Sequence, residues 1–235
     1  MFDKNLLKGK RILVTGGGSG LGKEMSRHFL TYGAEVIICG RRYEVLQKTA
    51  TELADETKGN ISAHSLDIRD SLAIEETINN IFDEGPLDGL VNNAAGNFIS
   101  RTNDLSPNGF NAIASIVFHG TFNMTNTVGK KWIELNKPGT ILSITTTWVW
   151  TGSPFVVPSA MSKSGINAMT KSLAVEWGPH NIRLNCIAPG PFPTEGAWSR
   201  LSPDTEATGG SMDQSSMSSN PVSYTHLRAH ETQPY

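Results

Sequence analysis

The chain has 235 residues, of which 38% are hydrophobic and 18% are charged. This length can bury one sizeable core, so a single α/β domain is the default expectation. Its 20 basic and 22 acidic side chains give a formal net charge of −2. No overall field therefore attracts nucleic acid or an anionic membrane surface, and a polyanionic ligand would need a local basic pocket.

Cysteine usage and hydropathy indicate an intracellular protein. Cys39 and Cys186 each lie in a short apolar run, which favours buried free thiols in a reducing compartment over a disulfide. No apolar run reaches the roughly 18 residues of a membrane span. The opening MFDKNLLKGK contains Asp3 and lacks a long apolar core, unlike a secretory signal. We therefore expect a cytoplasmic location.

Short runs rich in β-branched residues alternate with longer stretches of helical periodicity. The predicted strands are RILVT (11–15), EVIIC (35–39), ISAHSL (61–66), LDGLVN (87–92), TILSIT (140–145) and RLNCIA (183–188). The predicted helices run over residues 21–32, 44–57, 71–82, 109–135 and 159–177. This alternation predicts right-handed crossovers and a Rossmann-type, doubly wound parallel sheet with helices on both faces.

A glycine-rich turn, TGGGSGLG, follows the first predicted strand and leads into a helix. The literal G-x-G-x-x-G pattern fails because Lys23 occupies its last position, but Gly16, Gly20 and Gly22 fit a spacing variant. Glycines let the backbone approach a pyrophosphate, and free N–H groups at a helix start attract its charge. The alternative is a tight strand-to-helix connection without a ligand. The place of the glycine turn, directly after the first strand, favours a nucleotide.

The end of the second strand indicates which nucleotide binds. An NAD site usually places a carboxylate there for the ribose 2′-hydroxyl, whereas a 2′-phosphate needs cations. The segment VIICGRR instead offers Arg41 and Arg42, and an arginine can form paired hydrogen bonds with a phosphate. We therefore favour NADP(H); the alternative is that these arginines are solvated residues at a helix start.

Three further segments complete a resemblance to the short-chain dehydrogenase/reductase superfamily. They are NNAAGNF (92–98), Lys163 on a predicted helix, and IAPGPFPTEG (187–196). Within the superfamily, the segments NNAAGNFISRTNDLSPNGF and VVPSAMSKSGINAMTKSLAVEWG are most similar to 2,4-dienoyl-CoA reductases. The resemblance implies cofactor contacts from Gly16, Gly18, Ser19, Gly20, Leu21, Gly22, Arg41, Asp67, Asn93, Lys163, Pro189, Gly190 and Phe192. An aspartate in the place of Asp67 could equally cap a turn.

The superfamily's catalytic serine, tyrosine and lysine align with Thr146, Ser159 and Lys163. By resemblance, Lys163 would bind the nicotinamide ribose; the alternative is a plain surface lysine. A serine hydroxyl is a far weaker proton donor than a phenol with its pKa near about 10, so ordinary carbonyl reduction is disfavoured. Dienoyl-CoA reductases have serine at this place, so Ser159 agrees with the resemblance.

The implied reaction transfers hydride from NADPH to a conjugated diene, and charge spreads onto the thioester oxygen. That oxygen needs hydrogen-bond donors more than it needs an acid. Asn97 would be one donor by resemblance, or else a turn asparagine. Trp148 stands where mitochondrial members place a donor tyrosine, so either its indole N–H is the second donor or its ring walls the acyl pocket.

Other correspondences concern the acyl-CoA. By resemblance, its contacts would be Arg69, Phe98, Ser106 and Arg200, and for each a solvated or packed role is the alternative. Val117 occupies the place of a catalytic asparagine found in many relatives. We expect the nearby His119 to be a packed or surface residue, and we expect no metal site.

Periodicity stops after the last predicted strand. We expect one reductase domain over residues 1–202 and a loop or disordered tail over 203–235. Residues 223–235 resemble translated adapter DNA and are expected to be non-native. In that tail, His226 and His230 have a metal-pair spacing to which we give little weight. The family's seventh strand is not readable after Ala188, and the resemblance implies a homo-oligomer for the full-length form.

The sequence thus predicts an NADPH-dependent 2,4-dienoyl-CoA reductase of fatty acid β-oxidation. Two alternatives stay open. One is a short-chain reductase for another carbonyl or enoyl substrate, and the other is a non-catalytic NADP-binding protein.

Overall fold

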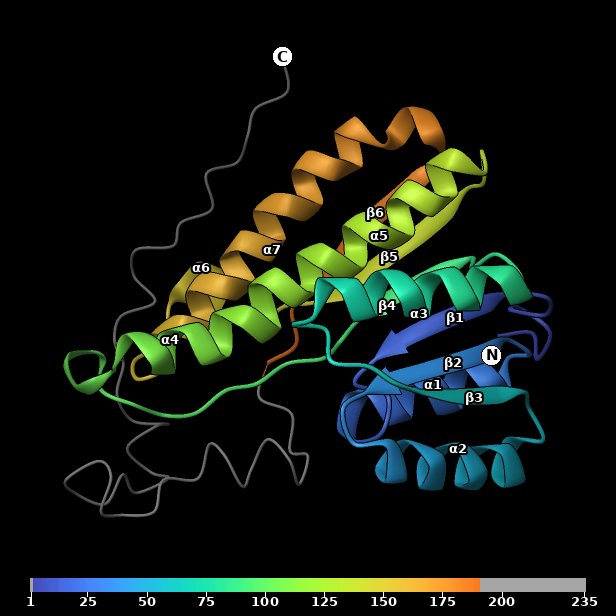
Figure 1. Cartoon of the computed structure of the whole chain (residues 1–235), viewed down its shortest axis with the longest axis horizontal. Coiled ribbons are helices and arrows are strands. Elements are labelled where there is room, and N and C mark those ends of the chain that lie inside the picture. Colours follow the sequence, from blue (N-terminus) through green and yellow to red (C-terminus); the bar gives the residue numbers. More distant parts are fainter. Residues whose placement is uncertain (1, 191–235) are drawn as a thin grey trace.

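The computed structural model describes residues 2–190, which form a six-stranded parallel sheet with helices on both faces (Figure 1). The strand order is β3-β2-β1-β4-β5-β6, so the direction of winding reverses between β1 and β4. The strands are β1 (Arg11–Thr15), β2 (Glu35–Gly40), β3 (Ile61–Ser65), β4 (Gly89–Asn92), β5 (Gly139–Ile144) and β6 (Ile182–Ile187). The predicted doubly wound fold is confirmed.

The four inner strands, β1, β2, β4 and β5, send alternate side chains into two separate cores. On one face, Val14 and Ile38 pack with Leu30 and Leu53 of helices α1 (Gly20–Thr31) and α2 (Tyr43–Thr57). On the other face, Leu13 packs under the helices α3 (Ser71–Glu84), α5 (Thr121–Glu134) and α7 (Val157–Glu176). Both faces of these inner strands are therefore buried, which explains why they read as apolar runs.

The helix predicted over 109–135 is confirmed as a helical span, but it is not α-helical throughout. It consists of α4 (Pro107–Ala114), a π-helical segment η2 (Ser115–Gly120) and α5, which follow one another directly. At the end of η2, a Cβ on Gly120 would lie 2.7 Å from the Ile68 side chain, so the helix packs closely against the segment after β3. The spacing of apolar residues did not reveal η2. A π turn holds more residues than an α turn, but the side chains on its buried face are still apolar, so the hydrophobic pattern looks the same.

Three short helical segments were also absent from the prediction. They are α6 (Trp148–Thr151), which follows β5, and the 3₁₀ turns η1 (Thr102–Asp104) and η3 (Gly178–His180). Each has three or four residues, which is too short to show a hydrophobic period. Of these, α6 matters most, since it lies in the region expected to hold substrate.

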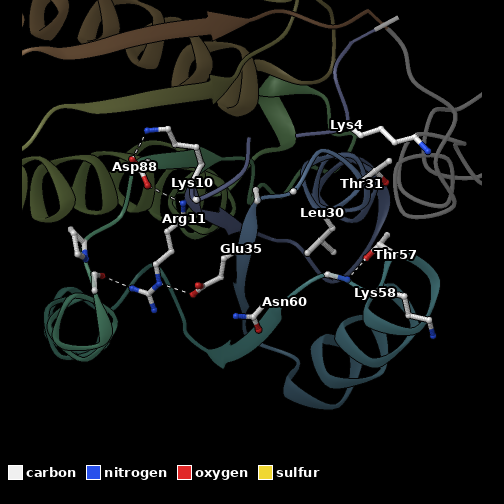
Figure 2. A pocket seen from close by; sticks show the side chains of 16 residues that line it. Lys4, Lys10, Arg11, Leu30, Thr31, Glu35, Thr57, Lys58, Asn60 and Asp88 are labelled. Atoms are coloured by element: carbon white, nitrogen blue, oxygen red, sulfur yellow. Dashed lines mark hydrogen bonds and ion pairs between the residues drawn. The ribbon is translucent and has the colours of Figure 1, made fainter. Parts of the chain in front are cut away.

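Arg11 joins the amino ends of β1 and β2 to the carboxyl end of α3. Its guanidinium donates to Glu35 on β2 at 2.6 Å, to Glu84 at 2.7 Å, and to the carbonyl oxygens of Ile81 and Gly85 at the end of α3. Figure 2 shows this side chain lining a pocket of about 680 Å³ at the end of the sheet opposite the glycine turn. Arg11 thus fixes α3 to the first two strands.

Both cysteines are free thiols, as predicted. Cys39 is fully buried, and burial raises its pKa to about 12. The prediction that Cys186 is buried was wrong, because it is half-buried on β6, which lies at the edge of the described sheet. Across residues 2–190, no helix combines the length and apolar character needed to cross a membrane.

Candidate cofactor and active site

The glycine turn after β1 adopts backbone conformations that require glycine. Gly16 and Gly20 have φ values of 67° and 54°, in the left-handed region that is costly for other residues. A Cβ on Gly22 would lie 2.4 Å from the Gly16 carbonyl oxygen and 2.6 Å from Asn93 Nδ2. These are the three glycines of the predicted spacing variant, and each has its own geometric reason.

The start of α1 leaves donors for a ligand. Ser19 is the N-cap residue in an extended conformation, and its side chain makes no capping hydrogen bond. Gly20 and Leu21 form the first helical positions, so their N–H groups point out of the helix start. Within the turn, Gly18 uses its carbonyl oxygen to accept from Thr49 of α2 at 2.9 Å. This glycine-lined helix start fits the pyrophosphate of a dinucleotide.

A hydrogen-bond network locks the turn to the end of β4. The Thr15 hydroxyl accepts from the backbone N–H groups of Asn93 and Ala94, both at 3.0 Å. Asn93 Nδ2 then donates to the carbonyl oxygen of Thr15 at 3.0 Å and to that of Gly16 at 3.3 Å. Asn93, predicted as a cofactor contact, thus lies against the turn, and Thr15 is a positioning residue that the prediction missed.

Below this network is a buried polar group that was also missed. Asn92 Nδ2 donates to Thr125 Oγ1 at 2.9 Å and reaches Ser143 Oγ at 3.4 Å. These three residues come from β4, α5 and β5 and are at most 4% exposed. The sequence signal was a polar residue near the end of each of two apolar strands, Asn92 as the last residue of β4 and Ser143 as the last but one of β5.

Lys163 and Ser159 lie one turn apart on α7, and both are buried at 6% exposure. The Lys163 ammonium donates to the carbonyl oxygen of Ile144, at the end of β5. Burial lowers the pKa of Lys163 from 10.5 to about 8, with a smaller opposing effect from Cys186. The alternative of a plain surface lysine is therefore wrong.

Two loops extend the site beyond β4 and β5. Thr146 and Trp148 are half-buried, with Trp148 at the first position of α6. Phe98 packs against a small core that includes Ile166 of α7. The loops are joined where the Ser100 N–H donates to the Phe155 carbonyl oxygen at 2.9 Å. Phe98 and the α6 region therefore lie over the same end of α7 as Lys163.

Asn97 contributes an unusual polar group to this region. Its Oδ1 is buried and has no hydrogen-bond partner among the described residues. Buried amides normally find partners, and leaving one unpaired is costly. An unpaired amide beside Phe98 fits a role in binding a ligand that satisfies it.

The ends of β2 and β3 bring charged residues together. Arg41 is exposed just after β2, and Asp67 is half-buried just after β3. Arg69 donates to Asp67 through Nε at 2.9 and 3.0 Å, and this pairing holds the pKa of Asp67 below its usual value. Arg69, predicted to contact acyl-CoA, pairs with Asp67, the residue predicted to contact the adenine.

The remaining predicted residues lie in varied settings. Ser106 caps α4 by accepting from the Gly109 N–H at 3.0 Å, and its side chain is exposed. Pro189 and Gly190 follow β6, whereas Phe192 and Arg200 lie outside the described residues, as do the predicted tail and its His226 and His230. His119 is exposed on η2, as one of its two alternatives stated.

The fold and these residues define a class of protein. A parallel sheet with a winding reversal between β1 and β4, and a glycine turn leading from β1 into α1, is the architecture of a dinucleotide-binding α/β protein. The family model described as short chain dehydrogenase matches residues 10–204. The chain belongs to the short-chain dehydrogenase family, whose members are nicotinamide-dependent oxidoreductases.

Individual relatives agree with this assignment. The chain is 47% identical over 198 residues to a Caenorhabditis elegans protein named probable 2,4-dienoyl-CoA reductase 3, which covers 83% of this chain and 64% of that one. A crystal structure of a Bacillus anthracis short chain dehydrogenase is 44% identical, with a TM-score of 0.76 over 79% of this chain and 75% of that one.

A second solved structure was determined with a cofactor. It is an actinorhodin polyketide ketoreductase variant with NADPH, 30% identical, with a TM-score of 0.77 over 81% of this chain and 73% of that one. The chain spans 63 to 64% of the length of the curated C. elegans relatives that it matches.

Proposed function

We propose that the chain is part of an NADPH-dependent reductase that reduces a conjugated C=C bond in an unsaturated fatty acyl-CoA, as 2,4-dienoyl-CoA reductases do. The observation that carries the proposal is the pair Ser159 and Lys163 on one face of α7, both buried. The buried cation is kept, while the residue four positions earlier cannot act as a proton donor of useful strength.

The cofactor would lie along the glycine turn and the ends of the first strands. The N–H groups at the start of α1 would hold the pyrophosphate, and Lys163 would bind the nicotinamide ribose. Arg41 and Arg42, both exposed directly after β2, favour a 2′-phosphate and hence NADP(H) over NAD(H). When bound, the reduced cofactor supplies a hydride.

The residues of the chain would then stabilise negative charge on the substrate. Hydride addition to the far end of a conjugated thioester places charge on the thioester oxygen, which hydrogen-bond donors stabilise. The buried amide of Asn97 supports a donor role, because a half-turn of the side chain exchanges its donor and acceptor ends. Water can protonate the carbon afterwards, so Ser159 need not act as an acid.

Trp148 stands where the mitochondrial dienoyl-CoA reductases place a donor tyrosine, so its role decides whether the chain has a second hydrogen-bond donor for the thioester oxygen. Its indole either donates to the thioester oxygen or walls the acyl pocket. Replacing Trp148 with Phe keeps most of the bulk and removes the N–H. An unchanged kcat in Trp148→Phe would eliminate the donor role, whereas a fall of roughly a hundredfold would support it.

Steady-state oxidation of NADPH tests the proposal. A 2,4-dienoyl-CoA and a simple ketone would be compared under the same conditions, and we expect turnover of the thioester alone. Activity confined to the ketone would support a different short-chain reductase. Tight NADPH binding without turnover of any acyl-CoA would support a non-catalytic binding protein.

Three wider predictions depend on the same proposal. They are a place in fatty acid β-oxidation, a cytoplasmic location and a homo-oligomer for the longer protein. The name of the C. elegans relative, probable 2,4-dienoyl-CoA reductase 3, supports a place in fatty acid β-oxidation. Fractionation of cells and the mass of the purified protein in solution would test the other two.

A further inference from the structure

Arg69 is held back onto its own loop. Its Nε lies 3.0 and 2.9 Å from the two carboxylate oxygens of Asp67, and its backbone N–H also donates to Asp67 Oδ1 at 3.1 Å. Hydrogen bonds between two charged groups in this forked arrangement are the strong, geometrically specific kind. The guanidinium of Arg69 is therefore engaged by Asp67.

Asp67 faces a second cation from the neighbouring strand. Gly40 and Ser65 are partners in the β2–β3 register, and the Leu66 N–H donates to the Gly40 carbonyl oxygen at 2.9 Å. Arg41 and Asp67 follow these joined positions directly. The charge of Arg41 also lowers the pKa of Asp67, with Arg69 as the larger cause. Asp67 is thus paired with Arg69, and Arg41 follows the neighbouring strand at the same edge of the sheet.

The balance of charge at this point depends on Arg69. Arg41 and Asp67 alone would sum to zero, and a free carboxylate near Arg41 would repel a phosphate and compete for that arginine. With Arg69 paired to Asp67, the three residues carry a net charge of +1, which favours an anion.

We propose that Arg69 is a specificity-determining residue that neutralises Asp67 and so leaves Arg41 available for the 2′-phosphate of NADP(H). This inference rests on the proposed NADP(H) site. It adds a role for Arg69, which follows β3 rather than β2. Arg69 acts through Asp67, so the inference also predicts that removing both charges together restores the preference.

Equilibrium binding of NADPH and NADH to the 235-residue chain tests this inference through the ratio of the two dissociation constants. In Arg69→Gln we expect the preference for NADPH to fall roughly fivefold, a modest change because the residues are partly exposed. In the double variant Asp67→Asn/Arg69→Gln the preference should return to the wild-type value. Arg183→Gln, an exposed arginine on β6 that donates to Thr140, is the matched control and should change neither constant.

The outcomes separate the inference from the proposed function. A wild-type chain that binds NADH in preference to NADPH would refute the NADP(H) proposal itself. A wild-type chain that prefers NADPH, with the same preference in Arg69→Gln, would overturn the role of Arg69. A preference lost in Arg69→Gln and not restored in the double variant would also overturn it, because Arg69 would then contact the phosphate directly.

Discussion

The ammonium group of Lys163 on α7 donates a hydrogen bond to the carbonyl oxygen of Ile144, the last residue of β5. This contact brings a buried positive charge to the carboxyl end of the sheet, where doubly wound proteins bind their ligands. Only the folded chain desolvates this lysine. The relationship therefore links the position of α7 to the ionisation of the group expected to bind cofactor.

The first prediction concerns the pH dependence of activity. With its pKa lowered to about 8, Lys163 carries its charge below that pH and loses it above. We expect kcat/KM for the acyl-CoA to be level below pH 8 and to fall above it, since kcat/KM reports ionisations of the free enzyme. In Lys163→Arg the charge persists, so any remaining activity should not fall in that range. A level wild-type profile up to pH 9.5 would contradict this assignment.

The second prediction concerns Ser159. Because an aliphatic hydroxyl is a poor acid, we expect Ser159→Ala to keep kcat with a dienoyl-CoA within about threefold of wild type. A general acid contributes roughly a hundredfold or more, so a loss of that size would show that Ser159 does transfer a proton. Thermal unfolding of both proteins would confirm that the variant is folded, since Ser159 is buried.

The third prediction uses the unpaired amide of Asn97. We expect Asn97→Ala to lower kcat roughly a hundredfold, as loss of an oxyanion donor does. Its free energy of unfolding should be unchanged or raised by up to about 1 kcal/mol, because a buried unpaired group is removed.

Asn79 on α3 provides a matched control for this prediction. Its Oδ1 is also buried without a partner among the described residues, but α3 ends at Arg11, beside the amino ends of β1 and β2. Asn79→Ala should have a similar effect on stability and leave kcat unchanged. Equal losses of activity in both variants would mean that Asn97 acts through the fold.

The sequence predicted the sheet because its inner strands are buried on both faces and all its strands are bounded by turn residues. The glycine turn was also predictable, because Gly16, Gly20 and Gly22 are needed for local backbone conformations and close approaches that their spacing in the sequence already indicates. The pairing of Arg69 with Asp67 was not, since a two-residue separation on a loop gives no periodic signal. The π-helical segment η2 and the network around Thr15 depend on contacts between distant segments, which spacing along the chain does not record.

The fourth prediction concerns stability at the end of the sheet away from the site. Arg11 is 12% exposed in its side chain and pairs with Glu35 and Glu84. Removing it leaves the carbonyl oxygens of Ile81 and Gly85 without this donor. We expect Arg11→Met to lower the free energy of unfolding by about 2 kcal/mol, with unchanged cofactor affinity of the folded fraction.

Lys10 offers the comparison for Arg11 on the adjacent residue. It pairs with Asp88 at 2.9 Å, with side-chain exposures of 53% and 36%. Exposed ion pairs contribute little, so Lys10→Met should change the free energy of unfolding by less than about 1 kcal/mol. Chemical denaturation of both variants measures the difference, and equal effects would show that Arg11 contributes no more than an exposed cation.

The fifth prediction tests the close approach within the glycine turn. A methyl group on Gly22 would lie 2.4 Å from the Gly16 carbonyl oxygen, so Gly22→Ala must move either the turn or the start of α1. We expect NADPH binding to weaken at least roughly tenfold and the free energy of unfolding to fall by about 1–3 kcal/mol.

Gly178→Ala is the control, because a Cβ there meets no atom within 4 Å. Since its stability should stay within about 0.5 kcal/mol, a loss of NADPH binding confined to Gly22→Ala would place the cofactor at the turn. Undiminished binding in Gly22→Ala would instead make this turn a strand-to-helix connection without a ligand.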